Sequence, residues 1–90
     1  MVERELQIVN EKGLHLRAAS ELVKLTSSLS CQVSLSNGVI EVDGKSILGV
    51  AALGAPKESR IVVRTRGEDE DGAMEKIDEL FRRGFYEDVL

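Results

Sequence analysis

Residues 32–43, QVSLSNGVIEVD, carry apolar and polar side chains in alternation on both sides of Asn37-Gly38 and predict a β-hairpin. Asn37 and Gly38 both tolerate the positive φ that a two-residue type I′ turn requires. Such a turn sets a register in which the apolar residues of the two strands share one face. The expected pairs are Ser36 with Val39, Leu35 with Ile40, and Val33 with Val42. One face of the hairpin is therefore expected to cover a hydrophobic core.

Strand and helix patterns alternate on both sides of this hairpin. Residues 2–8 alternate between apolar and polar side chains, as a strand with one solvated face does. Residues 16–29 instead place apolar side chains three and four apart, which is typical of an amphipathic helix. After the hairpin, residues 47–53 suit a short apolar helix and residues 60–66 a further strand. The acidic start of residues 68–84 favours the N-terminus of a last helix, which is expected to fray at its end. The predicted order is βαββαβα.

These elements define the expected fold class. Four half-polar strands and helices with one apolar stripe each imply a four-stranded antiparallel sheet with three helices on one face, an α+β open-faced β-sandwich. The chain has 90 residues, of which 42% are hydrophobic, and this leaves room for one core. Residues 1–90 are therefore expected to form a single domain.

The composition argues against several classes of function. Twelve basic residues face 16 acidic ones, so the net charge of −4 disfavours nucleic acid as the main partner. No apolar run approaches the ~20 residues that span a bilayer, and the charged start of the chain is unlike a signal peptide. With one cysteine, Cys31, and one histidine, neither a disulfide nor a metal site is expected, and no cofactor is implied. Cys31 is expected to be a small, half-buried apolar residue in a cytoplasmic protein.

Residues 13–19, GLHLRAA, are the best candidates for chemistry. His15 lies at the junction between a loop and the predicted helix, two residues before Arg17. The N–H groups and the positive dipole of a helix N-terminus attract anions, and the same dipole favours a neutral, nucleophilic imidazole. Arg17 adds a charged donor for phosphate oxygens. These parts suit a ring that holds a phosphoryl group, although a capping or surface histidine is the alternative interpretation of the residues alone.

Residues 44–46, Gly-Lys-Ser, do not belong to a P-loop, because the first glycine of that motif would stand where the chain has Val39. Ser46 is instead expected to be the N-cap of the following short helix, where it could also be phosphorylated. That helix has more apolar residues than one stripe can bury. Ile47 or Leu48 is therefore expected to be exposed as a docking site for partners, and the alternative is a helix buried in the core.

Three blocks of sequence resemble the histidine-containing phosphocarrier (HPr) family of the bacterial phosphoenolpyruvate-dependent phosphotransferase system: residues 13–19, 45–54 and 67–70. The resemblance covers essentially the whole chain and implies the same open-faced sandwich. It implies that His15 takes phosphate on Nδ1 from enzyme I and passes it to enzyme IIA components, with Arg17 as the phosphate partner. It also implies regulatory phosphorylation of Ser46, by an HPr kinase/phosphorylase where one exists. The protein would be a monomeric carrier and not an enzyme.

The chain departs from the family pattern G-L-H-A-R-P-A at two positions. Leu16 replaces alanine, which adds bulk where partners approach, and Ala18 replaces proline, which restores a backbone N–H. Both leave the nucleophile and the arginine in place, so they bear on the choice of partner. A regulatory protein of a nitrogen-related or catabolite-control branch, acting on a kinase or a transcriptional regulator, remains the alternative function.

Overall fold

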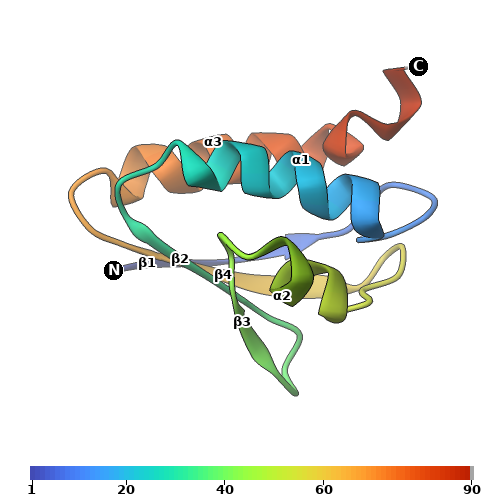
Figure 1. Cartoon of the computed structure of the whole chain (residues 1–90), viewed down its shortest axis with the longest axis horizontal. Helices are drawn as coiled ribbons and strands as arrows, with labels where there is room; N and C mark the ends of the chain where they lie inside the picture. The colour runs from blue at the N-terminus through green and yellow to red at the C-terminus, as the bar shows by residue number, and fades with distance from the viewer. Residues whose placement is uncertain (90) are drawn as a thin grey trace.

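The computed structural model describes residues 1–89 and shows a four-stranded antiparallel sheet beneath a layer of helices (Figure 1). The strands are β1 (Val2–Gln7), β2 (Gln32–Ser36), β3 (Glu41–Asp43) and β4 (Arg60–Arg66), in the spatial order β1-β4-β2-β3. The helices are α1 (Leu16–Ser27), α2 (Ile47–Ala52) and α3 (Glu70–Arg82), followed by a 3₁₀ segment, η1 (Gly84–Val89). The predicted βαββαβα order and open-faced sandwich are confirmed, and η1 is an addition to them.

One face of the sheet forms the floor of the core. β4 pairs with β1 and β2, and the pairs Leu6 with Ile61 and Leu35 with Val63 place buried side chains on the face toward α1 and α3. The opposite face is open and carries charged side chains, among which Arg64 bridges Glu3 and Glu41. The helices contribute the stripes expected from their spacing, which consist of Ala18, Ala19, Leu22 and Thr26 from α1 and Ala73, Met74, Ile77, Leu80 and Phe81 from α3.

The predicted hairpin register is wrong by two residues. Leu35 pairs with Val42 and Ser36 with Glu41, so residues 37–40 form a four-residue loop in place of a two-residue turn. A type I′ turn needs positive φ at both central residues, but only Gly38 has it. The side-chain Oδ1 of Asn37 instead accepts the N–H groups of two loop residues, at 2.9 Å each, which stabilises the wider loop. Because side chains of a strand alternate between the two faces of the sheet, a shift of two residues keeps Val42 on the core-facing side.

Two further details of burial differ from the sequence expectations. Val39 and Ile40 lie in the hairpin loop and are exposed, Val39 by 88%, whereas Ile40 was expected to share the core-facing side of a strand. Cys31 was expected to be half-buried but is almost fully buried at the base of β2. The thiol packs in the apolar core, and this burial raises its pKa.

The segment η1 returns the chain to the start of α1. Gly84, Phe85 and Tyr86 all have φ between 56° and 62°, which turns the backbone sharply after α3. Phe85 is buried against Phe81, with 4.8 Å between ring centroids, and η1 packs on both α1 and α3. Figure 1 shows η1, in red, at the same end of the molecule as the first turn of α1. The sequence predicted only that the last helix frays here.

Candidate functional site

The loop before α1 is fixed by close backbone contacts. The N–H of Leu14 donates to the carbonyl of Ala55 at 2.8 Å, and the side-chain amide of Asn10 donates to the carbonyl of Gly13 at 2.6 Å. Gly13 has a φ of 69°, and a Cβ there would lie 2.3 Å from the Ala55 oxygen. Glycine is therefore required at this position, both for its φ and for the close approach of the two loops. The loop delivers His15 to the start of α1.

His15 is the N-cap residue of α1. Its backbone is extended, with φ −78° and ψ 179°, and its carbonyl accepts the N–H of Ala19. Its Nδ1 accepts the backbone N–H of Arg17 at 3.2 Å, which is a capping role usually taken by Ser, Thr, Asp or Asn. The N–H groups of Leu16 and Ala18 have no protein partner among residues 1–89. The Nδ1 atom therefore lies at the positive end of the helix dipole, beside free donors.

The other ring nitrogen faces a carboxylate that the sequence analysis missed. Nε2 of His15 is buried without a hydrogen-bond partner among the described residues, and Glu87 Oε1 lies 3.7 Å away. Burial opposes ionisation of Glu87, but donors from Asn10 and Lys12 and the nearby His15 together hold its pKa below the ordinary value. Glu87 reaches the site through the fold-back of η1. No local sequence pattern signals this turn.

Arg17 and Leu16 project from the first turn of α1. Both side chains are exposed, Leu16 by 62%. The guanidinium of Arg17 forms no hydrogen bond or ion pair within residues 1–89, in contrast to Arg4 and Arg64, which each bind two carboxylates. A charged group without a partner at a helix N-terminus is available to an anionic ligand.

Ser46 and α2 match the sequence expectations. The Oγ of Ser46 accepts the N–H of Gly49 at 3.1 Å and so caps α2. Within α2 only Val50 is buried, whereas Ile47 is 37% and Leu48 is 77% exposed. The short helix α2 packs against α1 and β3. Its exposed apolar side chains therefore lie on the helix next to α1, whose N-cap is His15. The expected exposure of Ile47 and Leu48 is confirmed.

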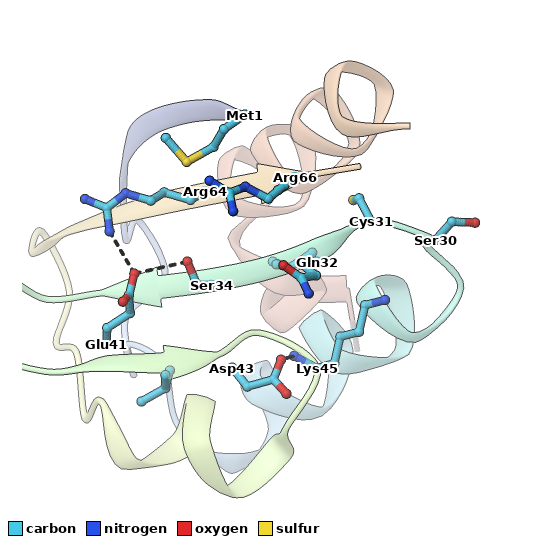
Figure 2. Close-up of a pocket in the computed structure, with 12 residues that line it drawn as sticks. Met1, Ser30, Cys31, Gln32, Ser34, Glu41, Asp43, Lys45, Arg64 and Arg66 are labelled. Carbon is cyan, nitrogen blue, oxygen red and sulfur yellow. Dashed lines mark hydrogen bonds and ion pairs between the residues drawn. The ribbon is translucent and has the colours of Figure 1, made fainter. Parts of the chain in front are cut away.

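A broad hollow lies elsewhere, on the open face of the sheet. Figure 2 shows this pocket, which has a volume of about 680 Å³ and is lined by residues of β2, β3 and β4 but not by His15. Within it Glu41 accepts from both Arg64 and Ser34, and Lys45 donates to the carbonyl of Leu29. Within residues 1–89 no group of three or more potential ligands could hold a metal ion, and no helix is long and apolar enough to cross a membrane.

Comparisons with known proteins agree on one family. The family model described as the phosphorylation site of the PTS HPr component matches residues 2–83. The phosphocarrier protein HPr of Xylella fastidiosa is 44% identical over 89 residues, which is 99% of this chain and 100% of that protein. HPr from Thermoanaerobacter tengcongensis superposes with a TM-score of 0.91 at 31% identity over 97% of this chain and 98% of that one. Crh of Bacillus subtilis, described as a catabolite repression protein and a swapped dimer, has a TM-score of 0.74 at 26% identity over 93% and 97% of the two chains.

Proposed function

From the premise that this chain belongs to the HPr family of phosphotransferase-system phosphocarriers, we propose that His15 accepts a phosphoryl group from enzyme I and donates it to enzyme IIA components. The protein acts in this relay as a carrier and not as a catalyst, because it is itself the acceptor in one transfer and the donor in the next and cannot turn over alone. The observation that supports this proposal most strongly is the position of His15 Nδ1 at the N-terminus of α1.

The geometry at Nδ1 suits phosphoryl transfer. The lone pair of Nδ1 forms the new N–P bond while the N–P bond of the donor's phosphohistidine breaks and its electron pair returns to the donor ring. The transition state is loose, so it needs alignment and charge more than covalent help. In the free protein the N–H of Arg17 donates to Nδ1. In the phosphorylated protein the same N–H donates to a phosphoryl oxygen instead. The free N–H groups of Leu16 and Ala18 and the guanidinium of Arg17 supply further donors.

Partners dock on the exposed apolar side chains beside this site. Leu16 on α1 and Ile47 and Leu48 on α2 are exposed on helices that pack against each other. An apolar surface next to the reacting atom suits a transient complex, in which enzyme I and enzyme IIA use the same face in turn. The carrier then works as a cytoplasmic monomer, and size-exclusion chromatography with light scattering measures its mass in solution.

Ser46 is the regulatory site of the same surface. Its hydroxyl caps α2 directly before Ile47 and Leu48, so a phosphate there places a dianion at the docking side chains. An HPr kinase/phosphorylase is the enzyme that would add it, and a transcriptional regulator is a candidate reader of the modified form. A purely regulatory role in a nitrogen-related or catabolite-control branch is not favoured, because Leu16 and Ala18 leave His15 and Arg17 in the arrangement that a phosphoryl acceptor needs.

Reconstitution of the relay tests the proposal. The purified protein is incubated with enzyme I, labelled phosphoenolpyruvate and a family enzyme IIA component. We expect an acid-labile label on this protein that chases into enzyme IIA. Label that never leaves the protein would contradict a carrier role, and the absence of label in the wild type would contradict the proposal as a whole.

A further inference from the structure

The two ring nitrogens of His15 lie in different environments. Nδ1 accepts a backbone N–H and therefore presents its lone pair there, so the neutral ring carries its proton on Nε2. Nε2 is buried and has no hydrogen-bond partner among residues 1–89, although Glu87 Oε1 lies 3.7 Å away. Buried polar atoms are nearly always satisfied, so an unpaired N–H that faces a carboxylate needs an explanation.

The Glu87 carboxylate is held firmly in this position. Its Oε2 accepts the side-chain amide of Asn10 at 3.1 Å, and both oxygens accept the N–H of Lys12 at 3.3 and 3.4 Å. The side chain is only 12% exposed. The backbone that carries it is anchored by Phe85, which is buried, and turns through two non-glycine residues with positive φ. Such backbone conformations are costly and persist where the surrounding structure enforces them.

We propose that Glu87 is a positioning residue that keeps the proton on Nε2 of His15 throughout phosphoryl transfer. This inference rests on the proposed function of His15 as the phosphoryl acceptor. When Nδ1 bonds to phosphorus while Nε2 keeps its proton, the ring becomes a cation, and the Glu87 carboxylate balances that charge. When the phosphoryl group leaves, the N–P electron pair returns to Nδ1 and the leaving group is a neutral imidazole.

The proton on Nε2 determines how readily the phosphoryl group leaves Nδ1. Without it, breaking the N–P bond would release an imidazolate anion, which is a far poorer leaving group. Positive charge on neighbouring segments opposes the cation: Lys12 in the preceding loop, Arg17 two residues after His15, and the positive end of the α1 dipole. Glu87 is the carboxylate that counters them, since no other acidic side chain within residues 1–89 forms an ion pair with His15.

The single histidine of the chain allows a direct test by ¹⁵N NMR of histidine-labelled protein. The protein is phosphorylated chemically with phosphoramidate, so that the measurement does not depend on enzyme I. The pH at which Nε2 loses its proton in the phosphorylated form is then compared among variants. Glu87→Gln keeps an oxygen for Asn10 and Lys12 but removes the charge, and we expect it to lower this midpoint by about one pH unit.

Two variants control this measurement. Glu11→Gln removes a carboxylate of the same loop that binds Lys57, and we expect it to leave the midpoint unchanged. Glu87→Asp restores the charge on a shorter side chain and should recover part of the shift. Amide spectra of each variant report whether η1 keeps its place. A Glu87→Gln protein with intact spectra and the wild-type midpoint would overturn the role of Glu87, whereas failure of enzyme I to phosphorylate the wild type would overturn the proposed function alone.

Discussion

At the scale of single residues, the His15 ring has a structural role as a helix cap, to which the proposed function adds a chemical one. Histidine is an uncommon N-cap, and its Nδ1 here accepts the N–H that Ser or Asp oxygens usually accept. Under the proposed function, phosphorylation of Nδ1 would remove that acceptor and place phosphoryl oxygens beside the same N–H. The start of α1 would then stay capped in both states, and the fold would not change during the cycle.

Arg17 provides the first test at this scale. Its guanidinium is exposed and has no partner within residues 1–89, so Arg17→Ala should change the free energy of unfolding by less than about 0.5 kcal/mol. Transfer from enzyme I should slow by about tenfold or more, because a donor to the phosphoryl oxygens is lost, while phosphorylation still reaches completion. Rapid-quench kinetics measure the rate. Arg82→Ala, which alters an exposed arginine on α3, is the matched control, and equal rates in the two variants would contradict the role of Arg17.

Gly13 and Gly72 form a matched pair for stability. Gly13→Ala places a Cβ at positive φ and 2.3 Å from the Ala55 oxygen, so it should lose at least about 2 kcal/mol of unfolding free energy. Gly72 lies in α3 with open space around its Cα, so Gly72→Ala should gain about 0.5–1 kcal/mol. Urea denaturation measures both values. A Gly13→Ala protein as stable as the wild type would show that the loop before α1 is not tightly packed.

At the scale of elements, α2 shows what local sequence specifies well. Ser46, the run of apolar residues and Gly54 define a capped two-turn helix, and the structure has it, with Gly54 at a φ of 56°. The hairpin shows the limit of the same reasoning. Its two strands were predicted, with Val33, Leu35 and Val42 on the core side, but the loop between them is longer than expected. The Asn37 N–H donates to the carbonyl of Ile40 and its side chain accepts two loop N–H groups, and strand alternation alone does not specify this closure.

The candidate site likewise contains residues that local sequence patterns predict and one residue that they do not. His15, Arg17 and Ser46 lie in or beside helix N-termini, where local patterns of capping and charge are informative. Glu87 lies 72 residues after His15 in the sequence. The two side chains come together because Gly84, Phe85 and Tyr86 turn the chain back toward α1. Two consecutive non-glycine residues in the left-handed region are rare, and propensity offers no signal for them.

The charge at the start of α2 gives a test at the element scale. Ser46→Asp keeps a good N-cap and adds a negative charge at the positive end of the helix, so the thermal midpoint should stay level or rise. Enzyme I should phosphorylate this variant more slowly, because docking must desolvate a charge beside Ile47 and Leu48. Calorimetry and transfer kinetics measure the two effects.

Gln32→Glu, which adds one negative charge on the open face of the sheet, controls for net charge in this experiment. Unchanged transfer by Ser46→Asp would contradict blocking at the docking surface. A large fall in its thermal midpoint would mean that the charge acts by disrupting α2.

At the scale of the whole molecule, the parts of the site come from both ends of the chain. The loop after β1, the first turn of α1 and the segment η1 meet at one end of the helical layer (Figure 1). The sheet contributes no group to the site, but the register of β1 with β4 fixes where the loop before α1 begins. The open face of the sheet carries the pocket of Figure 2, which is lined by other residues and in which Glu41 binds Arg64.

Carboxylates that bind groups on other elements make the free energy of unfolding depend on pH. Asp69 accepts the N–H groups of Ser30 and Cys31, and Glu75 binds Arg4, so the pKa of each lies below its ordinary value, 3.8 for Asp and 4.5 for Glu. The unfolded chain therefore binds protons more readily than the folded one. The stabilisation is complete above about pH 4.5, where the unfolded carboxylates are also ionised, and is lost as the pH falls through the folded values.

Thermal midpoints measured from pH 7 to pH 2.5 test this linkage. We expect a plateau down to about pH 5 and a progressive fall below about pH 4.5. Asp69→Asn should lower the plateau and flatten the fall, since one of the titrating groups is gone. A midpoint that rises as the pH drops below 4.5 would contradict the sign of these shifts.

Phosphorus and nitrogen NMR of the phosphorylated protein test the central claim most directly. The protein, labelled with ¹⁵N in its single histidine, is treated with enzyme I and phosphoenolpyruvate, beside a His15→Ala variant. We predict one ³¹P resonance that couples to Nδ1 of His15, and none in the variant, which should still fold although it loses the side-chain N-cap of α1. A phosphoryl group on Nε2, on any other residue, or on the His15→Ala protein would contradict the assignment of His15 Nδ1 as the acceptor.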